Sequence, residues 1–91
     1  MAELSVDLVA TDRKVWSGIA HQVSAPSVDG QIGILSGHTP ILAVLRPGTV
    51  RVIPDDGVAF EVHVTGGFVS VDDNLVTVVA DEITPVTGSE A

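Results

Sequence analysis

The sequence predicts an all-β fold, an antiparallel β-sandwich or flattened barrel of about 8–10 short strands. Apolar and polar residues alternate along several segments, which is the pattern of strands with one buried face. Groups of Gly, Pro, Asp and Asn separate these segments and supply the dihedral angles of tight turns. No segment of useful length repeats its apolar residues with a helical period.

The first expected strand alternates Leu4, Val6 and Leu8 with Ser5 and Asp7. Val50 and Val52 alternate with polar neighbours in the same way, as do the valines of segment 58–64. We expect strands near residues 4–10, 15–25, 31–35, 41–45, 49–54, 58–64, 68–71 and 75–82. The turns between them are expected at residues 12–14, 27–30, 46–48, 55–57 and 72–74. Each of the three aromatics, Trp16, Phe60 and Phe68, adjoins such a strand and is expected to be at least partly buried.

A chain of 91 residues has room for one hydrophobic core. Hydrophobic residues make up 45% of it, far more than a disordered segment carries. The stretch from residue 84 is small, polar and rich in turn formers. We therefore expect one β-sandwich domain over residues 1–83 and a short polar C-terminal tail over residues 84–91.

The charge balance disfavours two classes of partner. Twelve acidic residues against four Lys and Arg give a formal net charge of −8, which repels phosphate backbones and anionic lipid headgroups. We expect no nucleic-acid binding. The longest uncharged apolar stretch, residues 32–45, is too short to span a bilayer, so no direct membrane insertion is expected. The N-terminus lacks a signal-peptide pattern, and the absence of Cys fits a reducing, cytoplasmic setting.

Catalytic material is scarce in this sequence. Cys and Tyr are absent and the three His are scattered, so no nucleophile and base pair is evident. The His and Asp residues lack the close spacing typical of metal ligands. We expect no catalytic residue, no cofactor, no metal and no small-molecule ligand. The alternative is a small β-barrel ligand-binding module or enzyme with a site near His38, Gly66 and Gly67, since paired glycines let a ligand approach the backbone.

The most informative stretch runs from Ile32 to Leu45 without an Asp, Glu, Lys or Arg. Its segment 41–45 is apolar at consecutive positions, so both faces of that strand are apolar. A sandwich strand has one face toward the core, and the other therefore needs a cover. The cover is either another segment of this chain or a partner protein, with His38 at the rim of the contact.

These residues also carry a family resemblance. The segment Gly30–Leu42 (GQIGILSGHTPIL), followed by Leu45–Gly48 (LRPG), resembles the signature of the epsilon subunit of bacterial and chloroplast ATP synthases. Val15–Gly18 (VWSG) and the stretch from Val64 to Asp81 resemble two further segments of that family, so the likeness spans roughly residues 4–82. The family often has an acidic residue where Gln31 stands and Pro where Ser36 stands.

The resemblance implies a non-catalytic central-stalk subunit of a proton-translocating rotary ATP synthase, which couples ion flow to ATP synthesis. Its partners would be the gamma subunit and the c-ring, on the cytoplasmic face of the cell membrane. The residues implied for gamma are Ala10, His38, Ile41, Leu42 and Ala43. Those implied for the c-ring are Val28, Asp29, Gly30, Gln31, Ile32 and Gly33. In the family the sandwich usually continues into a two-helix hairpin, whose functions are not carried over to a sequence that stops at Ala91.

Overall fold

The computed structural model describes residues 3–55 and 57–86. This part of the chain is built from strands and contains no helix that could cross a membrane. The strands are β1 (Leu4–Ala10), β2 (Arg13–Ser27), β3 (Gly30–Leu35), β4 (Ile41–Leu45), β5 (Gly48–Pro54), β6 (Phe60–Val64), β7 (Gly67–Asp72), β8 (Leu75–Ala80) and β9 (Ile83–Pro85). The all-β prediction is confirmed, and every expected strand is present, two with the expected ends (residues 4–10 and 41–45) and the others with ends shifted by one or two residues.

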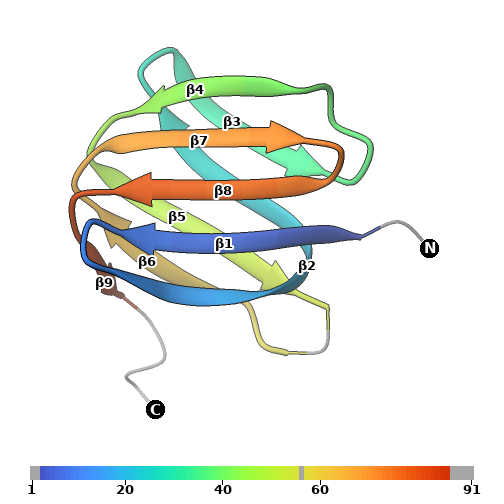
Figure 1. Cartoon of the computed structure of the whole chain (residues 1–91), viewed down its shortest axis with the longest axis horizontal. Coiled ribbons are helices and arrows are strands. Elements are labelled where there is room, and N and C mark those ends of the chain that lie inside the picture. The colour runs from blue at the N-terminus through green and yellow to red at the C-terminus, as the bar shows by residue number, and fades with distance from the viewer. Residues whose placement is uncertain (1–2, 56, 87–91) are drawn as a thin grey trace.

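The strands form two layers that share β2. One layer contains β4, β7, β8 and β1, and the other contains β3, β5, β6 and β9 (Figure 1). The first half of β2 pairs with β1, whereas its second half pairs with β3 and β5. The change of partner occurs at Ala20, which is opposite Leu4 in one pairing and Pro54 in the other. The architecture is therefore a flattened barrel folded about one long strand.

One pairing departs from the antiparallel prediction. β1 and β8 lie parallel, with Val6 opposite Val76 and Leu8 opposite Val78. The remaining strand pairs are antiparallel. Alternation within a strand shows which side chains face inward, but it carries no information on the direction of the neighbouring strand. Only the assembled layer decides that β8 runs beside β1 in the same direction.

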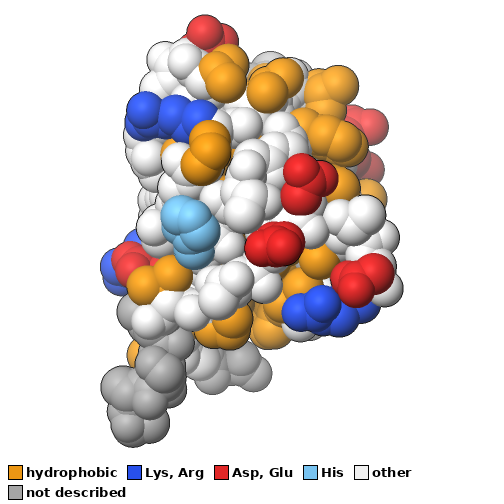
Figure 2. Space-filling view, turned by 90° about the vertical axis from the view of Figure 1, so that its left-hand side faces the viewer, with side chains coloured by type: hydrophobic (Ala, Val, Ile, Leu, Met, Phe, Trp, Pro, Cys, Tyr) orange, Lys and Arg blue, Asp and Glu red, His pale blue; other side chains and the backbone are white. Residues whose placement is uncertain are grey.

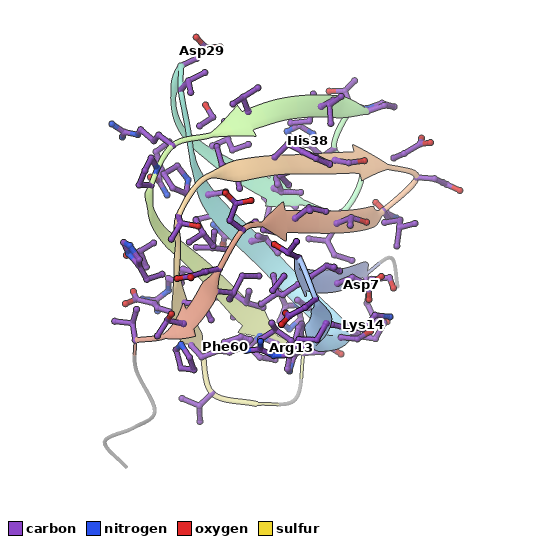
Figure 3. The ribbon with its side chains drawn as sticks, turned by 60° about the vertical axis from the view of Figure 1, so that its left-hand side comes forward. Asp7, Arg13, Lys14, Asp29, His38 and Phe60 are labelled. Atoms are coloured by element: carbon purple, nitrogen blue, oxygen red, sulfur yellow. The ribbon has the colours of Figure 1, made fainter. Side chains whose placement is uncertain are left out.

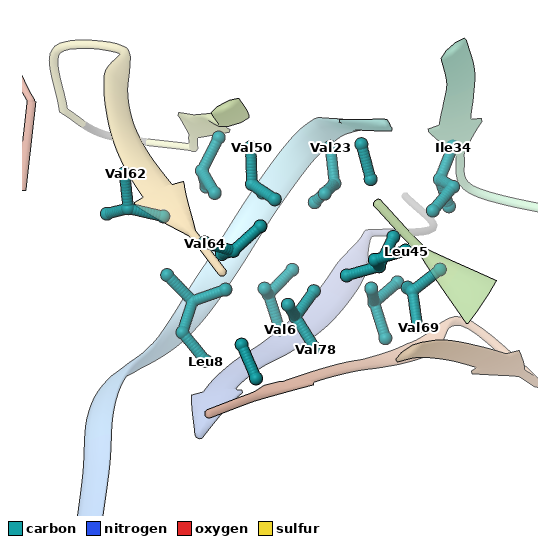
Figure 4. Packing of buried hydrophobic residues seen from close by; sticks show 14 of the residues in the cluster. Val6, Leu8, Val23, Ile34, Leu45, Val50, Val62, Val64, Val69 and Val78 are labelled. Atoms are coloured by element: carbon teal, nitrogen blue, oxygen red, sulfur yellow. The ribbon is translucent and has the colours of Figure 1, made fainter. Parts of the chain in front are cut away.

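The core consists of aliphatic side chains from both layers, and alternation places them inward. In β1, for example, Leu4, Val6 and Leu8 are fully buried, as Figure 4 shows for Val6 and Leu8 among their neighbours. Trp16 and Phe60 pack edge to face at the rim of this core, with ring centroids 5.1 Å apart. Phe68 has an exposed fraction of 42%, because Val69 and Val71 occupy the inward positions of β7. The prediction of partial burial is therefore confirmed for Trp16 and Phe60, whereas Phe68 lies on the outer face of β7.

The C-terminal boundary lies later than the sequence indicates. Residues 83–85 form β9, and they pair antiparallel with β6 through Val62, His63 and Val64. The backbone N–H of Val86 then donates to the carbonyl oxygen of Glu61. A polar tail from residue 84 was predicted from composition, but the β6 edge offers unpaired backbone groups that composition does not reveal. The rest of the predicted tail, residues 87–91, is outside the described residues.

We expect Gly67→Ala to destabilise the fold much more than Gly37→Ala does. Both glycines have positive φ, of 139° and 86°. A Cβ on Gly67 would overlap the carbonyl oxygen of Val79 and lie 2.8 Å from Cα of Ala80, whereas a Cβ on Gly37 would meet nothing within 4 Å. Gly37→Ala should cost about 1–2 kcal/mol from backbone strain alone. Gly67→Ala should cost roughly 3 kcal/mol or more. Equal losses in urea unfolding would contradict the close approach of β7 and β8.

Candidate partner-binding surface

The outer side of the β4 and β7 layer carries exposed apolar side chains. Leu42 is 73% exposed, Val44 58% and Phe68 42%. Val44 lies opposite Phe68 in the β4–β7 pairing, and Phe68 lies opposite the half-buried Val79 in the β7–β8 pairing, so Val44, Phe68 and Val79 form a row across the strands. We call Leu42, Val44, Phe68 and Val79 the apolar face. Figure 2 shows hydrophobic side chains gathered on the upper right of the molecule, the side of this layer.

The described residues do not supply the intrachain cover considered for segment 41–45. Leu42 and Val44 are open to solvent, so within residues 3–55 and 57–86 no other segment covers them. Isolated exposed apolar residues are common, but a contiguous group on one sheet face is typical of an interaction surface. The apolar face is therefore left uncovered by the described part of the chain and is a candidate partner-binding surface.

Of the five residues implied for gamma, Leu42 alone points outward on this face. Ile41 and Ala43 are half-buried and pack against the core, and Ala10 is 4% exposed. His38 is half-buried in the loop after β3, where its Nδ1 lies 2.7 Å from the carbonyl oxygen of Thr39. Alternation could have added Val44 from the sequence, because it follows Leu42 by two residues. Phe68 could not be added, because it joins the face only through the β4–β7 register.

The β2–β3 hairpin is a defined structure rather than a loose loop. Ser27, 3% exposed, donates a hydrogen bond of 2.6 Å from its Oγ to the carbonyl oxygen of Gly30 and accepts one of 3.2 Å from the N–H of Asp29. Gly30 has a φ of 130°, which only glycine adopts readily. The N–H of Val28 donates to the carbonyl oxygen of Val44, which ties the hairpin to β4. This network holds the tip in one orientation.

The residues implied for the c-ring divide between the tip and the two faces of β3. Val28 and Asp29 are exposed at the tip, and Gln31 and Gly33 are exposed along β3. Ile32 packs against the core. Asp29 lies at one end of the molecule and His38 lies lower, near β4 and β7 (Figure 3). The hairpin tip and the loop that holds His38 therefore lie at opposite ends of β3.

The alternative site near His38, Gly66 and Gly67 is not assembled. His38 lines a shallow hollow with Asp72, Asp73 and Asn74, at the end of β7. Gly67 begins β7 and lies opposite Leu45 and Ala80, and Gly66 precedes it, so these glycines are at the other end of the strand. The described residues hold no group of His, Asp and Glu arranged as metal ligands. The sequence-based alternative placed His38 in one site with Gly66 and Gly67, but the length of β7 keeps His38 apart from these glycines.

A small charged cluster lies where the start of the described chain meets β2 and the end of β5. Nε2 of His21 is 3.0 Å from Oδ1 of Asp55. The Asp55 carboxyl also hydrogen-bonds to that of Glu3 and repels its charge, so the pKa of Glu3 is raised. All three residues are at the surface, away from the β2–β3 tip, so this cluster ties segments together rather than forming part of the hairpin surface.

Comparisons with known proteins agree with this architecture. The family model described as "ATP synthase, Delta/Epsilon chain, beta-sandwich domain" matches residues 3–86. The ATP synthase epsilon chain of Micrococcus luteus is 51% identical over 80 residues, which cover 88% of this chain and 88% of that protein. The epsilon chain of Rhodococcus erythropolis is 45% identical over 82 residues, covering 89% and 67%.

Among solved structures, the fold is similar to a chain of the mitochondrial ATP synthase of Euglena gracilis, solved as OSCP/F1/c-ring. The TM-score is 0.88 at 22% sequence identity, over 99% of this chain and 59% of the Euglena chain. At this identity the likeness concerns the fold. It covers the sandwich and leaves about two fifths of the Euglena chain without a counterpart.

We expect Ser27→Ala to loosen the hairpin tip. The substitution removes both hydrogen bonds of the Ser27 hydroxyl, which should cost about 1 kcal/mol of stability or somewhat more. The amide of Asp29 should also exchange its hydrogen faster, because the Ser27 oxygen is its acceptor. Ser36→Ala, at an exposed position beyond β3, serves as the control and should change neither quantity. Unchanged exchange at Asp29 in Ser27→Ala would contradict the hairpin network.

Proposed function

The chain belongs to the family of ATP synthase Delta/Epsilon chains, through their β-sandwich domain, and we propose that it joins the gamma subunit to the c-ring in the central stalk. As a member of this family it is a non-catalytic subunit of a rotary ATP synthase. The gamma subunit and the c-ring as its individual partners are our proposal. It rests on the apolar face and the β2–β3 hairpin described above.

The apolar face is the observation that carries the gamma contact. Removing apolar area from water contributes roughly 25 cal/mol per Å², and Leu42 and Val44 lie exposed side by side on one face of β4. Phe68 extends this surface onto β7, and aromatic residues are frequent among the anchors of protein interfaces. We assign the apolar face to gamma, with Leu42 as its most exposed member and His38 in the loop that precedes β4. Ala10, Ile41 and Ala43 would support it from below.

The β2–β3 hairpin is the proposed contact with the c-ring. Its tip exposes Val28 and Asp29, and its backbone is held by Ser27 and Gly30. A rigid, exposed turn can press against a partner without losing much conformational entropy on binding. Gln31 would take part through a neutral amide. Ile32 and Gly33 follow the tip along β3 and would support it. The hairpin would transmit motion and would bind no cofactor.

In this arrangement the chain performs no chemistry. Its contribution is mechanical, because a compact barrel bonded at two surfaces transmits rotation from the ring to gamma, and so couples proton flow to ATP synthesis. ATP synthase is a membrane-associated complex, and we place the chain on its cytoplasmic face as a peripheral subunit. The fold has no membrane-crossing helix among its described residues, so its membrane association would come through the complex.

We expect Leu42→Asp to weaken binding to the gamma subunit without unfolding the domain. Leu42 is 73% exposed, so the isolated domain should melt as the wild type does. In the complex the Asp carboxylate would be desolvated without a partner, and the loss should be about 2 kcal/mol or more. Calorimetric titration with purified gamma measures this loss.

Leu35→Asp is the matched control for that titration. Leu35 is 56% exposed, and its substitution by Asp introduces the same charge as Leu42→Asp. However, Leu35 lies on β3 and not on the apolar face. It should leave gamma binding close to the wild-type value. Full affinity in Leu42→Asp, or an equal loss in Leu35→Asp, would remove the gamma assignment from this face.

The absence of Cys from the sequence allows a direct test of the ring contact. Asp29→Cys places a single thiol at the exposed hairpin tip, and Ser36→Cys places one beyond the opposite end of β3. In assembled enzyme, a short thiol-to-amine cross-linker should join the chain to the c subunit from position 29 and not from position 36. Cross-linking from position 36 alone would reverse the orientation that we propose.

A further inference from the structure

The four basic residues are not spread over the surface but occur as two pairs. Arg13 and Lys14 lie at the opposite end of the molecule from Asp29, where Arg13 contacts Asp12 at 3.3 Å and Lys14 contacts Asp7 at 3.7 Å (Figure 3). Arg46 and Arg51 line one hollow of about 550 Å³. Two of the four positive charges on a domain of net charge −8 thus converge on one site.

The hollow adjoins the β2–β3 hairpin close to its tip. Its lining includes Ser24, Pro26 and Gln31 together with both arginines and Glu61. Pro26 is opposite Gln31 in the β2–β3 pairing, and its carbonyl oxygen accepts a hydrogen bond of 3.0 Å from the backbone N–H of Arg46. We call this site the arginine hollow. The backbone of Arg46 is therefore fixed to the same hairpin that we assign to the c-ring.

The two guanidinium groups differ in what they bind. Nη1 of Arg51 is 3.4 Å from Oε2 of Glu61, so this side of the hollow already holds one carboxylate. In the part of the chain that the structure describes, no hydrogen bond or ion pair engages the exposed side chain of Arg46. A guanidinium offers five N–H donors in a planar fork that matches a carboxylate. Gln31 can add an amide donor.

We propose that the arginine hollow receives an acidic side chain from the stalk-facing surface of the c-ring, an inference that rests on the ring contact proposed above. The guanidinium of Arg46 donates hydrogen bonds to the incoming carboxylate, and the neutral side-chain amide of Gln31 lies beside it as a further donor. A single carboxylate is favoured over an anionic lipid headgroup because a domain of net charge −8 is repelled by the many like charges of an anionic membrane, whereas one carboxylate meets Arg46 at contact distance. The existing Arg51–Glu61 pair shows the same chemistry within the hollow.

The test measures binding of the full chain to purified c-rings in nanodiscs of neutral lipid. Arg46→Glu places a like charge against the ring carboxylate and should weaken binding about 10-fold or more. Arg13→Glu changes the net charge by the same amount at the far end of the molecule and should stay within about 2-fold of the wild type. Arg46→Gln, which keeps a donor, should fall between them. Thermal melting checks that all three variants fold.

A second set of rings separates the chemistry of the partner from general charge effects. On rings whose stalk-facing Asp and Glu are changed to Asn and Gln, the difference between Arg46→Glu and Arg13→Glu should vanish. If it persists there, or if the two variants bind unmodified rings equally, the arginine hollow is not a carboxylate site. If the wild type instead binds anionic vesicles without rings and Arg46→Glu abolishes this, a lipid headgroup replaces the carboxylate. Failure of the wild type to bind any ring overturns the ring contact itself.

Discussion

The pairing of one long strand with both layers is the constraint on which the rest of the fold depends. β2 is 15 residues long and changes partner at the fully buried Ala20, from β1 to β5. Its second half also carries β3 and so sets the direction of the β2–β3 hairpin. A small side chain at the crossing lets the layers approach closely. The hairpin and the arginine hollow both inherit their positions from this strand.

The packing of the core also explains the apolar face. Aliphatic residues from both layers fill the interior, and period-two alternation leaves the other residues of each strand outside. In β4, Leu45 takes a buried position while Leu42 and Val44 are left outside. The domain alone gains nothing from these apolar residues, whereas a partner that covers them gains the free energy of desolvation. A small domain of marginal stability would be further stabilised by such binding.

The two proposed surfaces have different physical characters, which suits two partners. The apolar face has no charged residue among its four members and relies on burial of hydrocarbon. The hairpin side exposes Asp29 and Gln31 beside Val28, is held by backbone and hydroxyl hydrogen bonds, and has Arg46 bonded close to its tip. Salt does not screen hydrophobic burial, whereas it screens a guanidinium–carboxylate contact at a rim. The gamma and ring contacts should therefore respond differently to ionic strength.

The sequence by itself determined the strands, because alternation such as Leu4, Val6 and Leu8 is a local property. The apolar run of β4 and the motif Gly30–Leu42 also indicated the surface and the family. Only the tertiary structure decided that β1 and β8 pair in parallel, that β9 pairs with β6, and that Phe68 lies opposite Val44. It likewise separated His38 from Gly67 along β7 and brought Arg46 and Arg51 into one hollow. Alternation fixes the face of a side chain, but which strands are neighbours depends on contacts between residues far apart in the chain.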